Sequence, residues 1–116
     1  DGAQLGPSFG RDSGKPFRHI GAPDTCRILM PGYRLNTADS YLAAVANVEH
    51  MGFTDRGIVG LLAGREYPAV GPKSPEEVRA ALLALHLQFF DKYLLDRAGA
   101  LTAPEDPNVT LCLNHQ

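Results

Sequence analysis

The sequence lacks several features that would place it in a familiar functional class. Its 116 residues carry a net charge of −2, which leaves no basic surface for nucleic acid. No apolar run approaches the roughly 18–20 residues that cross a membrane. Cys26 and Cys112 lack CxxC spacing, and no His/Asp/Glu pair has the spacing of a zinc-binding helix. We therefore expect no nucleic-acid partner, no membrane span, no metal and no other cofactor.

The chain opens on Asp1 without an initiator methionine, and we expect no signal peptide in it. Such a start suggests a processed product or a segment of something longer. The two cysteines allow one disulfide or two buried thiols, and Asn108-Val109-Thr110 matches the glycosylation sequon. These features favour a secreted or extracytoplasmic protein.

Two apolar segments predict β-strands, at residues 17–21 and 40–48. The second is apolar throughout, which is typical of a strand buried on both faces of a parallel sheet. Helices are expected at residues 54–64 and 74–96, with a weaker strand at 109–113. Residues 24–34 are ambiguous, and a short helix there could close at residues 28–30, before Pro31 breaks it. The last helix has the clearest start, since Ser74-Pro75-Glu76-Glu77 supplies an N-cap, a first-turn proline and a capping-box glutamate.

The strand, helix, strand, helix order predicts an α/β fold with right-handed crossovers. Two parallel strands do not make a stable sheet alone, so we expect this chain to complete a larger sheet supplied by another chain or segment. Residues 1–97 would form the body of the domain, and residues 98–116 a C-terminal tail.

His50 is the strongest candidate for chemistry. It follows the buried strand at its carboxyl end, where open α/β sheets bind their ligands, and Gly52 allows tight backbone geometry beside it. A carboxylate on one ring nitrogen would fix the other as a proton acceptor, and Asp1 and Asp24 could both supply it. A lone histidine beside an apolar strand is, however, more often a packed or surface residue.

No serine of the chain has the setting of a nucleophile. Gly6-Pro7-Ser8-Phe9-Gly10 spells GxSxG, but a nucleophile elbow needs an apolar strand before the serine and a helix after it. Neither neighbour fits. A self-sufficient small hydrolase that uses Ser8 is therefore the weakest of the hypotheses, and the attacking group is expected elsewhere.

Five segments occur in one order along the chain: Asp1-Gly2, Leu5-Gly6-Pro7, Lys15-Pro16-Phe17, residues 49–55 and residues 87–94. That order resembles the C-terminal portion of α/β hydrolases similar to the platelet-activating-factor acetylhydrolases and their bacterial esterase and lipase relatives. The resemblance covers residues 1 to about 95. It implies that Asp1 is the triad acid and His50 the base. Asp24 is the alternative acid, because many other α/β hydrolases use the position it occupies.

The resemblance implies a serine ester hydrolase in which this chain supplies the acid and the histidine. The nucleophilic serine and the oxyanion hole would lie on an N-terminal chain or segment, so this chain alone would be inactive. Its substrate would be an ester or lipid. Met51 and Phe53 would line the acyl pocket or belong to the core. The alternative is a non-catalytic structural or interaction module that retains the hydrolase scaffold.

Overall fold

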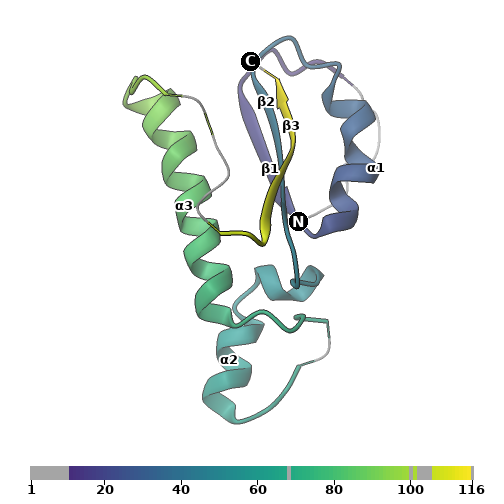
Figure 1. The fold of residues 1–116 in the computed structure, drawn as a ribbon, viewed down its shortest axis with the longest axis vertical. Helices are drawn as coiled ribbons and strands as arrows, with labels where there is room; N and C mark the ends of the chain where they lie inside the picture. Colours follow the sequence, from purple (N-terminus) through teal and green to yellow (C-terminus); the bar gives the residue numbers. More distant parts are fainter. Residues whose placement is uncertain (1–10, 68, 100, 102–105, 116) are drawn as a thin grey trace.

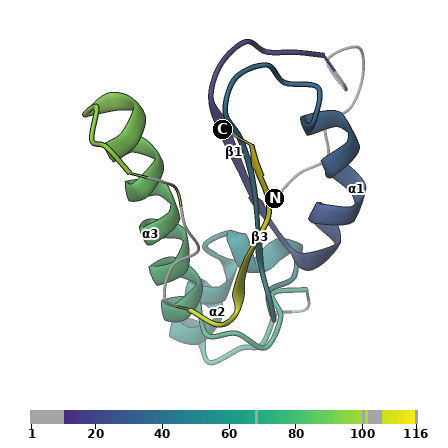
Figure 2. The same ribbon diagram turned by 45° about the horizontal axis from the view of Figure 1, so that its top comes forward.

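The computed structural model of the chain describes residues 11–67, 69–99, 101 and 106–115. A three-stranded sheet lies at its centre, with one long helix against each face (Figures 1 and 2). The elements in chain order are β1 (Phe17–Gly21), α1 (Pro23–Tyr33), β2 (Ser40–Val45), the 3₁₀ helix η1 (His50–Phe53), α2 (Arg56–Ala63), α3 (Pro75–Leu94) and β3 (Val109–His115).

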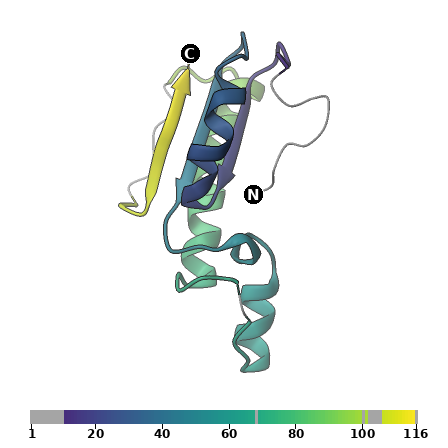
Figure 3. The same cartoon turned by 90° about the vertical axis from the view of Figure 1, so that its right-hand side faces the viewer.

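The sheet has the order β1-β2-β3, with β2 in the middle (Figure 3). β1 runs parallel to β2, and β3 runs antiparallel to it. All six residues of β2 are buried, as predicted for a strand covered on both faces. The strand ends at Val45, earlier than expected, because the chain turns at Asn47 with a left-handed φ of 62°. The α/β character is therefore confirmed, in a small mixed sheet.

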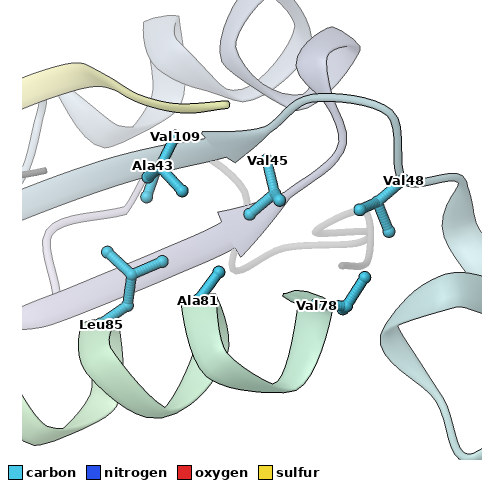
Figure 4. Close-up of a cluster of buried hydrophobic side chains, with 7 residues drawn as sticks. All are labelled: Ala43, Val45, Val48, Val78, Ala81, Leu85 and Val109. Atoms are coloured by element: carbon cyan, nitrogen blue, oxygen red, sulfur yellow. The ribbon is translucent and has the colours of Figure 1, made fainter. Parts of the chain in front are cut away.

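The core has two parts, one on each face of the sheet. Side chains from β2, β3, α3 and the segment after β2 point toward one another on the α3 face (Figure 4); they are Ala43, Val45, Val48, Val78, Ala81, Leu85 and Val109. On the α1 face, Leu42 packs against Leu29 and Tyr33. Burying an aliphatic side chain of this size contributes about 1.5–3 kcal/mol, so these two clusters fix both helices to the sheet.

The helix boundaries follow local signals with one exception. Ser74 Oγ accepts from the Glu77 N–H at 3.3 Å and Glu77 Oε2 accepts from the Ser74 N–H at 3.1 Å, which is the predicted capping box. The expected end of the first helix before Pro31 is wrong, since α1 continues to Tyr33. Its last turn is held by packing, because the Tyr33 ring lies 4.6 Å from that of Phe17 and is buried against the sheet.

A disulfide joins Cys26 on α1 to Cys112 on β3, with the two Cα atoms 5.8 Å apart. Of the two states that the sequence allows, the cysteines therefore form the bridge. It closes a loop with a sequence separation of 86 residues. Such a bridge typically stabilises a fold by about 2–4 kcal/mol. It also ties residues 109–115, within the segment expected to be a tail, to the α1 face of the sheet.

Within the described ranges, no helix has the length and apolar character needed to cross a membrane.

Candidate functional site

His50 is the first residue of η1, five residues beyond the end of β2, and its side chain is exposed. Because β1 and β2 are parallel, their carboxyl ends meet at one end of the sheet. The segment after β1 also opens there, and it carries Asp24 in the first turn of α1. The structure thus keeps the predicted relation between the histidine and the strand ends, with a short turn inserted before His50.

Backbone hydrogen bonds on both sides of His50 hold its loop in place. The Glu49 N–H donates to the Val70 carbonyl oxygen at 3.1 Å, and the Met51 N–H donates to the Ala69 carbonyl oxygen at 2.9 Å. Residues 69–73, which we call the strap, run beside the loop. A third hydrogen bond joins the two segments, in which the Lys73 N–H donates to the Asn47 carbonyl oxygen at 2.9 Å. The imidazole is therefore presented from a backbone that is fixed at several points.

Two glycines allow this close approach of strap and loop. A Cβ on Gly71 would lie 2.8 Å from the Asn47 carbonyl oxygen, and the residue has a φ of 86° that side chains rarely adopt. A Cβ on Gly52 would collide with the Val70 carbonyl oxygen and lie 2.7 Å from Val48 Cγ1. The role predicted for Gly52 beside the histidine thus has a geometric basis.

Of the two candidate acids, the structure describes only Asp24. Asp1 lies outside the described residues. Asp24 forms an ion pair with Arg27, one helical turn further along α1, with 3.7 Å between Oδ1 and Nη2. Both side chains are highly exposed, at 84% and 78%, so the pair contributes little to stability and leaves the carboxylate accessible.

The two predicted substrate-lining residues, Met51 and Phe53, are half-buried on η1. Phe53 packs against the hydrophobic cluster on the α3 face. It also lines a cavity of about 320 Å³, together with Arg18, Ile20 and Leu82. Phe53 is therefore a partial core residue with one side on a cavity, and its role in an acyl pocket stays a prediction.

A larger cavity, of about 570 Å³, lies on the other side of the loop, between η1, α2 and residues 65–75. Its size suits a small ligand. Glu49, next to His50, forms part of its wall, and His50 itself does not. Sequence reasoning missed this cavity. The signal was the glycine spacing of α2, since a Cβ on Gly60 would lie 2.8 Å from the Tyr67 ring.

A second polar cluster, which the sequence did not suggest, lies at the opposite end of the sheet. The Tyr93 hydroxyl donates to the Asp39 carboxylate and lies 2.8 Å from the Tyr41 hydroxyl. Lys92 Nζ is 3.6 Å from Asp39 Oδ2 and donates to the Tyr41 hydroxyl at 3.3 Å. Burial, followed by the hydrogen bond to Asp39, raises the pKa of Tyr93, so this phenol stays protonated and acts as a donor.

Comparisons of the chain with protein-family models, with curated proteins and with solved structures find no match. Across residues 11–67, 69–99, 101 and 106–115, no three His, Cys, Asp or Glu side chains are grouped so that they could hold a metal ion. The geometry around His50 is therefore the main structural indication of function.

Proposed function

We propose that this chain is the histidine-bearing part of a serine ester hydrolase of the α/β type. One observation carries the proposal: His50 follows the carboxyl end of a fully buried parallel strand, on a loop that the strap fixes from both sides. The resemblance of residues 1 to about 95 to α/β hydrolases points to the same role.

In the proposed mechanism, a serine on an N-terminal chain or segment attacks the ester carbonyl, and His50 takes the proton of its hydroxyl. Backbone N–H groups on that segment stabilise the oxyanion. His50 then gives the proton to the departing alcohol, and a water molecule releases the acid from the acyl-enzyme by the same steps. Asp1, or Asp24 as the alternative, orients the imidazole and stabilises its charged form.

The proposed substrate is an ester or lipid with an apolar acyl group. Met51 and Phe53 are proposed to flank the acyl chain, and Phe53 already lines a cavity of about 320 Å³. The disulfide between Cys26 and Cys112 supports a secreted or extracytoplasmic location, since such bonds persist in oxidising compartments.

The test uses the complete protein or complex that contains this chain and its serine-bearing segment, assayed with p-nitrophenyl butyrate. We expect His50→Ala to lower kcat/KM by at least about 10⁴-fold. His115→Ala, which removes the histidine of β3 that pairs with Ser40 at the opposite end of the sheet, is the matched control and should leave kcat/KM within twofold. Full activity in the His50→Ala protein would overturn the proposal.

The same preparation identifies the acid and the nucleophile. Asp1→Asn and Asp24→Asn, made separately, should differ strongly, because only the triad acid fixes the histidine tautomer. A fluorophosphonate probe should label a serine outside residues 1–116. Labelling of Ser8 would instead support a self-sufficient hydrolase.

A non-catalytic interaction module is the second candidate, and the outer surface of α3 favours it. A row of exposed apolar side chains follows the helix at spacings of three and four residues: Leu83, Leu87, Phe90 and Leu94. In that case the fluorophosphonate probe labels no serine in the complex, and His50→Ala changes no activity.

A further inference from the structure

β1 has a strand on one side only within the described part of the chain (Figure 3). The Phe17 N–H donates to the Asp39 carbonyl oxygen at 3.1 Å, toward β2. Backbone groups of successive strand residues point to opposite sides, so the N–H and C=O groups of Arg18 and Ile20 face away from β2. Such unpaired groups form a template on which another strand can add.

The Arg18 side chain offers a donor pair on the α3 face of β1, with Cζ 5.6 Å from the centre of the Tyr41 ring on β2. Its Nη1 donates to the Leu85 carbonyl oxygen on α3 at 2.5 Å. Its Nε and Nη2 are buried and have no hydrogen-bond partner. Those two atoms form the side of a guanidinium that binds a carboxylate through two parallel hydrogen bonds. Burial lowers the pKa of Arg18, which indicates that its charge is poorly hydrated and would gain from an anionic partner.

Cavities lie on both faces of the sheet at β1. The cavity of about 320 Å³ is lined by Arg18, Ile20, Phe53 and His86, among others. A second, of about 300 Å³, is lined on the α1 side by Phe17, His19, Tyr33 and Arg11, among others. No Asp or Glu of the described residues belongs to either lining, while arginine and histidine belong to both.

His19 adds an unpaired polar atom on the α1 side. Its Nδ1 lies 3.0 Å from the Tyr33 hydroxyl, and its Nε2 is buried without a partner. Among the described residues, four buried side-chain polar atoms lack hydrogen-bond partners, and three of these belong to Arg18 and His19 on β1. Buried polar groups are normally hydrogen-bonded, so the concentration of exceptions on one strand indicates a missing neighbour at that strand.

We propose that β1 is the docking edge for an extended segment from outside this chain, and that an aspartate or glutamate of that segment binds Nε and Nη2 of Arg18. A second copy of the chain fits poorly, because an edge-to-edge pair would bring two copies of Arg18 to one interface without an anionic partner for either. The inference rests on the sheet-completing partner of the proposed function, and it does not depend on ester hydrolysis.

The experiment follows ¹⁵N-labelled chain by NMR during titration with the peptide acetyl-Thr-Val-Glu-Val-Thr-Val-amide. We expect the Arg18 Nε–H signal and the backbone N–H signals of Arg18 and Ile20 to shift together. The same peptide with Gln in place of Glu should bind about tenfold more weakly, as expected on losing a charge-assisted bidentate pair. Arg18→Met should abolish the difference, and Arg34→Met, at an exposed site after α1, should keep it.

Three results would overturn the inference. The first is equal affinity for the Glu and Gln peptides in the unmodified chain, a comparison that requires no variant to fold. The second is an equal shift of the Arg18 signal with sodium acetate at the peptide's concentration, which would indicate a site for free carboxylates. The third is peptide binding only in a variant that starts at Arg11, which would assign the edge to residues 1–10. Loss of esterase activity in His50→Ala, measured separately, would still support the hydrolase if the peptide fails to bind.

Discussion

The two ends of the sheet use their polar side chains in opposite ways. At the amino end of β2, Asp39, Tyr41, Lys92 and Tyr93 bind one another in a half-buried network. At the carboxyl end, His50 is exposed, and backbone hydrogen bonds of its neighbours hold the loop. Side chains that bind one another support the first end, whereas backbone hydrogen bonds support the loop at the second end, where the histidine is exposed.

The difference also appears in how each end is connected through the chain. Tyr93 lies 54 residues from Asp39, so the network ties the last turn of α3 to the start of β2. The strap that supports His50 is only about 20 residues away, and its close approach depends on Gly71. The amino end should therefore be more sensitive to changes of polarity than to changes of side-chain volume, and the carboxyl end the reverse.

The largest expected effect comes from adding one methyl group at the carboxyl end. Gly71→Ala should lower the free energy of unfolding by about 3 kcal/mol, because the left-handed backbone and a backbone clash both oppose a Cβ. Urea unfolding followed by far-ultraviolet circular dichroism measures it. Gly64→Ala is the matched control: its φ is 61° and nothing lies within 4 Å of the added carbon, so about 1 kcal/mol is expected. Equal effects at the two glycines would contradict the tight approach of strap and loop.

At the amino end, removing one hydroxyl should have an intermediate effect. Tyr93→Phe leaves the ring in place and deletes the hydrogen bonds to Asp39 and Tyr41. A hydrogen bond to a charged group is worth about 1.5–3 kcal/mol, and partial exposure places the expected loss of stability near the lower value. Tyr67→Phe, at a half-buried tyrosine of the 570 Å³ cavity wall, should change stability by less than about 0.5 kcal/mol. If Tyr93→Phe left the free energy of unfolding unchanged, the network would contribute nothing to stability.

The network also predicts a dependence on alkaline pH. The pKa of Tyr93 is raised in the folded state, first by burial and then by its hydrogen bond to Asp39. Folding therefore favours the protonated phenol, and this stabilisation is complete below the unfolded pKa of about 10 and lost as pH rises above it. Unfolding curves from pH 9 to 11 should show a smaller fall in stability for Tyr93→Phe than for the parent. Some fall remains, because burial also raises the pKa of Tyr33.

The sequence predicts the parts of this fold that short-range signals determine. β1, the buried β2 and the capping box at Ser74 all follow from neighbours within a few positions. The prediction that the first helix ends before Pro31 was wrong, because the packing of Tyr33 on the sheet outweighs the lost backbone hydrogen bond. The disulfide stayed undecided because its two cysteines meet only when β3 joins β2.

The candidate site also combines features that short-range signals predict with features that depend on long-range contacts. The position of His50 beyond a strand end follows from hydrophobic pattern alone, and Gly52 signals the tight backbone beside it. The strap, the 570 Å³ cavity and the Asp39–Tyr93 pair each need two segments that are far apart in sequence to be folded together. No local pattern encodes such contacts. The segments that hold the loop are therefore harder to predict from sequence than the position of His50 itself.

The smallest expected effect on stability concerns the residue with the largest expected effect on activity. His50→Gln should lower the free energy of unfolding by at most about 1 kcal/mol, because contacts of exposed side chains contribute little. The same change should abolish ester hydrolysis in the complete protein, since an amide cannot take the proton of the serine. Urea unfolding and the p-nitrophenyl butyrate assay, run on one preparation, measure both. If His50→Gln costs as much stability as Gly71→Ala, the histidine holds its loop together and the contrast between the two ends of the sheet fails.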